Sequence, residues 1–314
     1  MKIAVLERDS VTVEDIDFSY LESVADITYY GRIEKEKVID VVKEYDGIIV
    51  NKTVIDENVI KSCPNLRYVG LFATGYNNID VKCAAEHNIT VCNVPSYSTD
   101  AVAQHVFSFI LYCASSLGKY ISSVNAGDYK KCKSFCYYPY PIEELKGKTL
   151  GILGYGSIGK RVAEIANVFG MNVIVYSRRN NCTPYEYVSK EELFKRSDFL
   201  TVHCPLNIET EKIVNAEMLS LMKDEAVLIN TARGGVVDEN ALADALKNGK
   251  IRAACIDTIT KEPMSEDCEL FGIENCYITP HIAWAAKQTR QRLVNIAADN
   301  IKAFTEESPI NKVN

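Results

Sequence analysis

The sequence lacks the features that mark membrane, secreted and nucleic-acid-binding proteins. Its longest apolar-leaning run, Val106–Ala114, is far shorter than a bilayer span and contains a serine. The opening residues MKIAVLERD reach Glu7 too early for the apolar region of a signal peptide. No basic block or low-complexity tract is present, and a net charge of −7 disfavours nucleic acid as a partner. We therefore expect a cytoplasmic protein that binds neither membrane nor nucleic acid.

Cysteine is frequent but follows no pattern. The chain has 11 cysteines and no CxxC pair, and Cys132 and Cys136, four apart, have no second pair to complete a metal site. We therefore expect reduced, mostly buried thiols and no metal. The length of 314 residues, with 47% hydrophobic and 25% charged residues, indicates a globular protein of two domains.

A glycine-rich turn between two apolar strands is the most informative segment. The segments Thr149–Leu153 and Asn172–Tyr176 are apolar, as expected of strands buried on both faces, and a helical pattern separates them. The turn has G-x-G-x-x-G spacing, made of Gly154, Tyr155, Gly156, Ser157, Ile158 and Gly159. In this context the first glycine permits a tight turn, the second lets a pyrophosphate approach, and the third lets helix and strand pack closely. The segment predicts a dinucleotide site with the diphosphate at a helix N-terminus.

The residues after the second strand bear on the choice of cofactor. An NAD site favours a carboxylate there, to accept from the ribose hydroxyls. This chain has Ser177, Arg178 and Arg179 instead, and guanidinium groups match phosphate geometry. We therefore predict NADP(H) over NAD(H). The alternative is that both arginines are solvated beside an indifferent adenosine pocket, with NAD(H) as cofactor.

Short apolar strands alternate with helical segments over most of the chain. This alternation predicts an α/β protein with two Rossmann-like domains, each built on a parallel sheet. The strands expected in the first domain are Lys2–Leu6, Gly47–Val50, Arg67–Leu71 and Thr90–Cys92. A helix over Ala101–Leu117 that ends at Gly118 is expected to connect the domains. The aromatic segment Lys119–Glu143 either wraps a partner subunit or runs over its own domain.

Two loops of the first domain follow predicted strands, where open α/β sheets bind ligands. The small residues Ala73, Thr74 and Gly75 leave backbone N–H groups accessible to an anion such as a carboxylate. In the other loop, Lys52 is a candidate to hydrogen-bond a substrate hydroxyl, as is Asn77 after the small residues. The alternative is that these are ordinary turns that face water.

Polar residues also follow the strands of the second domain, and parallel strands bring them to one edge of the sheet. They are His203, Arg233, Asp257, Glu262 and His281. Hydride transfer to nicotinamide from an alcohol needs a base for the hydroxyl proton and a cation for the carboxylate and carbonyl oxygens. His281 suits the first role and Arg233 the second, while Glu262 would favour the protonated imidazole. Spacing alone leaves His203 as a rival base.

Several motifs together resemble the D-isomer-specific 2-hydroxyacid dehydrogenases over nearly the whole chain. They are GYGSIG with its helix, HCPL at 203–206, NTARGGVVDE at 230–239, the DxxxxEP pattern at 257–263 and PHIAW at 280–284. The segments ATGYNNID at 73–80, NVPSYSTDAVAQ at 93–104 and YPIEELKGKTLGI at 140–152 are similar to the glycerate dehydrogenase or hydroxypyruvate reductase branch.

The resemblance implies roles for individual residues. Arg233 would bind the substrate carboxylate and carbonyl, and His281, tuned by Glu262, would be the acid in reduction and the base in oxidation. Asp257 would anchor the nicotinamide carboxamide, and the backbone amides of Ala73–Gly75 would hold the substrate carboxylate. The residues that would line the cofactor are His203, which is then not the base, and Cys204, Pro205, Thr231 and Ala232.

The resemblance also implies an architecture. Residues 1–98 and 286–314 would form a discontinuous substrate domain, and residues 99–285 the dinucleotide-binding domain. The active site would lie in the cleft between them, with closure over substrate, and the protein would be a homodimer. Two departures from the family pattern stand out: Ser177–Arg179 replaces the acidic residue of NAD-using members, and Ile259–Lys261 before Glu262 is unusual.

These observations predict an NADPH-preferring reductase that converts hydroxypyruvate to D-glycerate, with glyoxylate, reduced to glycolate, as a second substrate. One alternative is a D-lactate-type or broad 2-ketoacid reductase, since pocket shape decides between these substrates. Another is a non-catalytic NAD(H)-sensing protein of the corepressor type. The intact Arg233, Glu262 and His281 argue against the second alternative.

Overall fold

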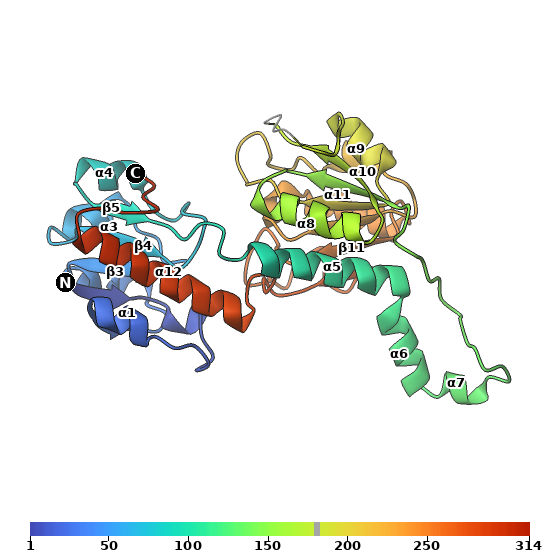
Figure 1. Cartoon of the computed structure of the whole chain (residues 1–314), viewed down its shortest axis with the longest axis horizontal. Helices are drawn as coiled ribbons and strands as arrows, with labels where there is room; N and C mark the ends of the chain where they lie inside the picture. Colours follow the sequence, from blue (N-terminus) through green and yellow to red (C-terminus); the bar gives the residue numbers. More distant parts are fainter. Residues whose placement is uncertain (179–182) are drawn as a thin grey trace. The chain divides into compact units, whose positions relative to one another are not determined.

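The computed structural model describes residues 1–178 and 183–314, which form two compact units (Figure 1). The first unit combines Met1–Ser98 with Trp284–Asn314, and the second is Thr99–Ala283. The first unit is discontinuous because the last helix, α12 (Lys287–Thr305), packs on α1 (Ser19–Val24) and β4 (Tyr68–Leu71). The C-terminal part of this unit thus begins at Trp284, two residues before the position expected from the sequence.

The first unit is built on a parallel sheet of five strands in the order β2-β1-β3-β4-β5. The other strands are β1 (Lys2–Val5), β2 (Asp26–Tyr29), β3 (Gly47–Val50) and β5 (Thr90–Cys92). One face is covered by α2 (Val38–Val42), α3 (Glu57–Ser62) and α4 (Val81–Glu86), and the other by α1 and α12. The strand order reverses between β1 and β3, which is where doubly wound sheets bind ligands.

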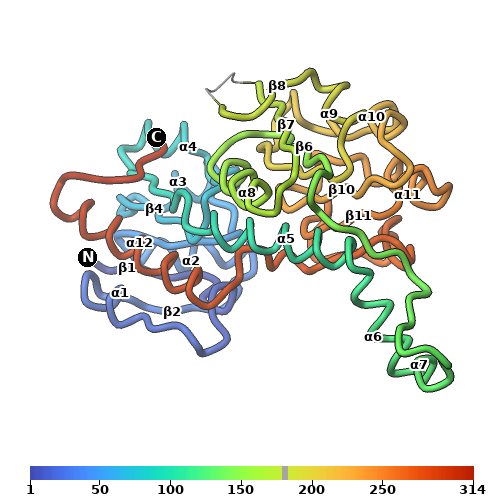
Figure 2. The backbone as a smooth tube through the Cα atoms, turned by 45° about the vertical axis from the view of Figure 1, so that its right-hand side comes forward, coloured from blue at the N-terminus to red at the C-terminus, as the bar shows by residue number. Residues whose placement is uncertain are grey.

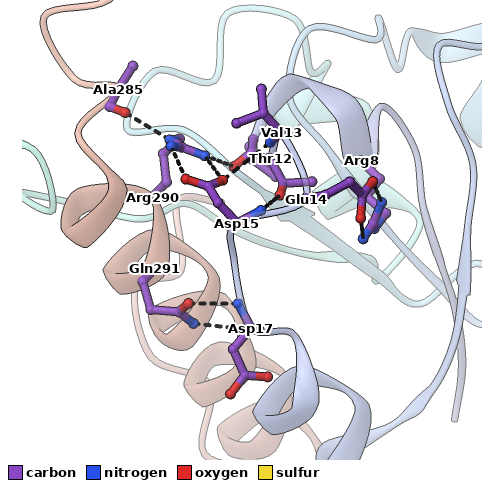
Figure 3. Close-up of polar contacts among 10 residues, drawn as sticks. Arg8, Thr12, Val13, Glu14, Asp15, Asp17, Ala285, Arg290 and Gln291 are labelled. Atoms are coloured by element: carbon purple, nitrogen blue, oxygen red, sulfur yellow. Dashed lines mark hydrogen bonds and ion pairs between the residues drawn. The ribbon is translucent and has the colours of Figure 1, made fainter.

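Side-chain and backbone contacts tie α12 to the loop after β1 (Figure 3). The Arg290 guanidinium donates to both carboxylate oxygens of Asp15 at 2.7 and 2.8 Å and, through Nε, to the carbonyl of Ala285 at 2.8 Å. The next residue, Gln291, accepts from the Asp17 N–H at 2.9 Å and donates to the Asp17 carbonyl at 2.7 Å. These bonds fix residues 11–17 to the start of α12.

The second unit holds a parallel sheet of seven strands in the order β12-β11-β10-β9-β6-β7-β8. The strands are β6 (Thr149–Leu153), β7 (Asn172–Tyr176), β8 (Glu186–Tyr187), β9 (Phe199–Val202), β10 (Val227–Asn230), β11 (Ala253–Ile256) and β12 (Cys276–Ile278). One face packs on α5 (Thr99–Ser115) and α8 (Ser157–Val168). The other face packs on α9 (Lys190–Arg196), α10 (Ala216–Leu221) and α11 (Glu239–Lys247). The predicted pair of Rossmann-like parallel sheets is confirmed, and here the order reverses between β6 and β9.

The segment after α5 differs from the prediction. The chain turns at Ser116, which has φ 51°, and α6 (Leu117–Asn125) then includes Gly118, the residue expected to end the preceding helix. A side chain at Gly118 would overlap the ring of Tyr112, so this glycine allows a close approach inside a helix. A short helix, α7 (Asp128–Lys131), follows. We call residues 117–143 the arm; α6 and α7 stand away from the sheet of their own unit in both views (Figures 1 and 2).

Within the described residues, no single helix is long and apolar enough to cross a membrane. Helices α5 and α6 pass that test of length and composition only as a pair, bent by 58°. Most apolar side chains of α5 are buried in the core of the second unit, as in the core helix of a globular domain.

Candidate functional site

The glycine turn follows β6 at the reversal point of the second sheet. Gly154 has φ 102°, and a Cβ there would lie 2.6 Å from the backbone nitrogen of Cys204. A Cβ on Gly159 would overlap the carbonyl of Gly154, so this position brings helix and turn together. A Cβ on Gly156, by contrast, would meet nothing within 4 Å. The three glycines therefore shape a turn that leaves open space at its middle, as the approach of a diphosphate requires.

The turn leads into α8, a helix of 12 residues whose N-cap is Gly156. Because Gly156 has no side chain, no capping group competes for the N–H groups of the first turn, and the positive end of the helix dipole faces the turn. The side chain of Tyr155 is buried and packs edge-on against Tyr185 at 6.3 Å between ring centroids, so Tyr155 offers only its backbone to a ligand. The arrangement suits an anion held by main-chain groups.

A buried hydroxyl points to a ligand beyond the end of β10. The Oγ1 atom of Thr231 is buried and has no hydrogen-bond partner among the described residues. Burying an unsatisfied hydroxyl costs free energy that a bound polar ligand would recover. Together with the open space at Gly156, this group makes the residues present a fit for a nicotinamide dinucleotide.

The end of β7 carries the residues proposed to recognise the adenosine ribose. The Tyr187 hydroxyl donates to the carbonyl of Ser177, an anchor that sequence reasoning missed because β8 was not predicted. The guanidinium of Arg178 pairs with the carboxylate of Glu209, and the side chain of Arg178 is 65% exposed. Arg179, the other predicted phosphate ligand, lies outside the described residues. Arg178 is thus accessible to an anion that can displace Glu209.

Glu262 and His281 form a direct pair, as predicted. His281 Nδ1 lies 2.7 Å from Glu262 Oε2, and the N–H of Ile259 donates to Glu262 Oε1 at 3.2 Å. Both side chains are partly exposed, 26% for His281 and 32% for Glu262. A carboxylate only accepts, so Nδ1 carries the proton of this bond and Nε2 remains for a substrate.

Asp257, which follows β11, holds the segment that carries His281. Its Oδ1 accepts from the Thr279 hydroxyl at 2.6 Å and from the N–H of Ile282 at 2.9 Å, and its Oδ2 accepts from the N–H of Ala283 at 2.9 Å. His281 itself has φ 54°, and its N–H donates to the Asp257 carbonyl at 2.9 Å. The Asp257 carboxylate therefore holds the chain on both sides of His281, through the Thr279 side chain before it and the backbone after it. Its Oδ2, with one recorded bond, retains acceptor capacity for the predicted carboxamide.

Arg233 follows β10, the neighbour of β11 in the sheet. Its turn is fixed by Asn230, which is fully buried, accepts from the N–H of Ala232 at 3.0 Å and donates to the carbonyl of Arg233 at 3.0 Å. The Arg233 guanidinium is exposed and donates to the Ala232 carbonyl at 2.7 Å. The ends of β10, β11 and β12 thus bring Arg233, Asp257 and His281 to one edge of the sheet. No contact links Arg233 to His281 in the described structure.

The structure separates His281 from its rival His203. Burial lowers the pKa of His203 to about 3, and its Nε2 lies 2.9 Å from the hydroxyl of Thr201. An imidazole with this pKa is neutral at physiological pH. Among the described residues, no carboxylate is paired with His203 to stabilise a proton. His203 and Cys204 lie against the glycine turn, which supports the cofactor-lining position that the sequence resemblance implied.

The loops of the first unit lie at the carboxyl ends of β3 and β4, as expected. The carbonyls of Ala73 and Thr74 accept from the Val94 N–H at 2.9 Å and the Asn93 side chain at 2.7 Å, respectively. Within the described residues, the N–H groups of Ala73, Thr74 and Gly75 have no recorded acceptor. Lys52 is exposed, after β3. Across all the residues that the structure describes, no group of three or more His, Cys, Asp or Glu side chains could hold a metal.

Comparison with known proteins places this geometry in a family. Residues 107–283 match the NAD binding domain of the D-isomer specific 2-hydroxyacid dehydrogenases. The hydroxypyruvate reductase of Blautia hydrogenotrophica is 40% identical, with all of both chains covered. The glycerate dehydrogenase of Methylorubrum extorquens is 35% identical over 99% of this chain and 98% of that protein.

A solved structure extends the likeness to three dimensions. It is the NADPH-dependent glyoxylate/hydroxypyruvate reductase of Sinorhizobium meliloti in complex with NADP and malonate. It is 28% identical, has a TM-score of 0.84, and the match covers 99% of this chain and 96% of that one. The chain therefore belongs to the D-isomer-specific 2-hydroxyacid dehydrogenase family and is an NAD(P)-dependent enzyme that resembles the glycerate dehydrogenase and hydroxypyruvate reductase branch.

Proposed function

We propose that this enzyme reduces hydroxypyruvate to D-glycerate with NADPH, and reduces glyoxylate to glycolate as a second activity. The 2.7 Å pair of Glu262 and His281, at the sheet edge that also carries Arg233, is the observation that carries the proposal. It provides a proton donor beside a cation, which is what reduction of a 2-keto acid needs. The names of the relatives support hydroxypyruvate and glyoxylate as the substrates.

The chain's own residues would divide the chemistry as follows. The Arg233 guanidinium binds the substrate carboxylate and polarises the C2 carbonyl oxygen. The backbone N–H groups of Ala73–Gly75 hold the carboxylate. His281 gives the proton on Nε2 to the carbonyl oxygen, while the Glu262 carboxylate stabilises the protonated ring and fixes its orientation. In the oxidative direction His281 takes the hydroxyl proton back.

Nicotinamide, when bound in its reduced form, supplies the hydride. The turn at Gly154–Gly159 and the start of α8 would hold the diphosphate, and the Thr231 hydroxyl and the free acceptor capacity of Asp257 Oδ2 would hold the polar groups of the nicotinamide half. Cys204, Pro205 and Ala232 would line the same site. His203, kept neutral by burial, would contribute contact rather than proton transfer.

The preference for NADPH would come from the end of β7. Arg178 and its partner Glu209 are both exposed, so a 2′-phosphate can compete for the guanidinium. The S. meliloti reductase, an NADPH-dependent relative, is consistent with this choice. Ser177 and Arg179 are proposed to add a hydroxyl and a second guanidinium.

Initial rates test both parts of the proposal. With hydroxypyruvate and matched subsaturating cofactor, we expect NADPH to give at least roughly tenfold the rate of NADH, since a charge-assisted bond to phosphate is worth about 1.5–3 kcal/mol. The Arg178→Gln variant should lose most of this advantage and keep its rate with NADH. Equal use of both cofactors by the wild type would refute the phosphate-binding role. No rate with hydroxypyruvate, glyoxylate or pyruvate would favour the non-catalytic alternative.

We also propose a cytoplasmic homodimer in which the arm covers a second subunit. The ten cysteines within the described residues are all unpaired, which supports a reducing compartment. The arm exposes large apolar side chains, which supports burial against another chain. They are Leu117, Ile121, Val124, Phe135, Tyr138 and Ile142.

A further inference from the structure

A buried carboxylate holds the loop that carries Lys52 in the first unit. Glu7, just after β1, is 9% exposed and has φ 66°, a left-handed conformation that non-glycine residues rarely adopt. Its Oε2 accepts from three successive backbone N–H groups, those of Asn51 at 3.1 Å, Lys52 at 2.8 Å and Thr53 at 2.8 Å. A single oxygen atom thus fixes the whole turn after β3.

Further bonds fix the same turn from its other sides. The side-chain amide of Asn51 donates to the Ser10 hydroxyl at 2.9 Å. The amide of Asn78, which lies beyond β4, donates to the carbonyls of Thr53 at 2.7 Å and Asn51 at 3.4 Å. The backbone around Lys52 is therefore held through the N–H groups of residues 51–53 and through the carbonyls of Asn51 and Thr53.

The turn that Glu7 holds lies where a ligand is expected to bind. It lies at the carboxyl ends of β1 and β3, where the strand order of the first sheet reverses and where open α/β sheets bind ligands. Three successive N–H groups that converge on one point form an anion-binding nest. Here the nest already holds Glu7, so the protein's own carboxylate occupies the place that a ligand phosphate or carboxylate would take.

Lys52 is the side chain of this turn that is available to a ligand. Its side chain is exposed, and no ion pair or side-chain hydrogen bond of its ammonium is recorded in the described chain. A lysine side chain is flexible, so its bond to a ligand is weak unless the backbone that carries it is already ordered. Since Glu7 orders that backbone before any ligand binds, only the side-chain torsions of Lys52 remain to be fixed.

We propose that Glu7 is a positioning residue for substrate discrimination. By holding the Asn51–Thr53 turn, it places Lys52 to hydrogen-bond the C3 hydroxyl of hydroxypyruvate and directs the substrate carboxylate to Ala73–Gly75 instead of the filled nest. A site built to bond a hydroxyl rejects the analogue without it, and pyruvate is that analogue. The inference rests on the proposed function, because it assumes a hydroxypyruvate reductase.

The test is a double-mutant cycle on Glu7 and Lys52. The readout is the ratio of kcat/KM for hydroxypyruvate to that for pyruvate. We expect Glu7→Ala and Lys52→Met each to lower this ratio at least roughly tenfold, through KM for hydroxypyruvate, and Glu7→Ala to cause no further loss in the Lys52→Met protein. Glu7→Gln keeps an acceptor oxygen and should retain most of the discrimination. Glu14→Gln, an exposed acid in the same segment, is the matched control.

Equal loss on both substrates, or a further loss when Glu7→Ala is added to Lys52→Met, would overturn the inference and leave Glu7 a purely structural residue. A ratio unchanged by Lys52→Met would overturn it as well. Hydrogen exchange gives a readout that does not depend on activity: the amides of residues 51–53 should exchange slowly in the wild type and rapidly in Glu7→Ala. If Glu7→Ala does not fold, Glu7→Asp, whose carboxylate is one methylene short of the nest, replaces it in the cycle. If the amides of residues 51–53 exchange slowly but the wild-type protein reduces no 2-keto acid, the proposed function is rejected. The role of Glu7 in discrimination is then rejected with it.

Discussion

At the scale of single residues, the chemistry depends on how the ring of His281 is held. Glu262 Oε2 lies 2.7 Å from Nδ1, which leaves Nε2 as the atom that exchanges a proton with substrate. The other described histidines have different surroundings: burial lowers the pKa of His203 to about 3 and also lowers that of His105, while His87 bonds the Cys83 carbonyl at the end of α4. His105 Nε2 also lies near a carboxylate, 3.7 Å from Asp257 Oδ1, but His281 is the described histidine that is hydrogen-bonded to one.

The His281→Ala variant should lower kcat for hydroxypyruvate by at least roughly a hundredfold, because general acid catalysis contributes that much or more. Glu262→Gln should cause a smaller loss, since the ring keeps a hydrogen-bond partner but not a negative charge. Steady-state kinetics measure both. His87→Ala, which removes an imidazole that bonds only the Cys83 residue of its own helix end among the described residues, should leave kcat unchanged. Turnover near that of the wild type in His281→Ala would reject the assignment.

Other residues make no chemical step but fix those that do. Asp257 binds the backbone beside His281, Asn230 binds the turn of Arg233, and Glu7 binds the turn of Lys52. Each is at least nine-tenths buried and makes two or more hydrogen bonds, whereas the group it positions is more exposed. Rigid buried anchors under exposed reactive groups are what a preorganised site requires.

At the scale of elements, the loop after β1 depends on α12 for its position (Figure 3). The Arg290 side chain lowers the pKa of Asp15 from its usual 3.8 to about 2. A carboxyl whose pKa is lower in the folded than in the unfolded protein stabilises the fold above pH 4, and this contribution is lost as the pH falls from 4 to 2.

Asp15→Asn should therefore lower the thermal unfolding midpoint at pH 7, where Asp15 is ionised in both states. The difference from the wild type should shrink toward zero near pH 2, and differential scanning calorimetry at both pH values measures it. Asp9→Asn, an exposed neighbour with no recorded hydrogen bond, serves as the control and should change neither midpoint. A difference that is equal at pH 7 and pH 2 would show that the Arg290 pair does not act through the charge of Asp15.

The sequence predicts elements whose signal is local. The strand β6, the glycine turn and α8 follow from an apolar run and glycine spacing, and the strands Gly47–Val50 and Thr90–Cys92 match the predicted bounds. The edge strand β2 has no fully buried residue and so no apolar run to reveal it. Gly118 suggested a helix end because glycine usually disfavours helix. It lies inside α6 instead, where the nearby ring of Tyr112 leaves no room for a side chain.

In the candidate site too, the sequence predicts the features with a local signal and misses those that depend on distant contacts. The pair of Glu262 and His281 could be predicted because both follow short strands whose order a parallel sheet fixes. The contacts of Glu7, Asn230 and Tyr187 could not, because each joins a side chain to a backbone whose position depends on folding of the whole sheet. Polar anchors of this kind have no periodicity that a single sequence reveals.

At the scale of the whole molecule, the arm is the feature that a single chain does not explain. Phe135 is 89% exposed and Tyr138 74% exposed, although side chains of this size favour burial. The segment around them bonds mainly to itself: the Tyr129 hydroxyl donates to the Phe135 carbonyl at 2.6 Å and the Tyr120 hydroxyl to the Tyr140 carbonyl at 2.8 Å. The arm is thus ordered internally while its apolar side chains face outward.

If a second copy of the chain covers the arm, Phe135→Ser should weaken the dimer. Burying a side chain of this size is worth about 1.5–3 kcal/mol, which corresponds to a dissociation constant raised by roughly ten- to a hundredfold. Sedimentation velocity over a concentration series measures this change. Val13→Ser removes a comparably exposed apolar side chain (79%) from the first unit and should leave the dissociation constant unchanged. A monomeric wild type, or a dimer equally strong in both variants, would show that the arm does not hold two subunits together.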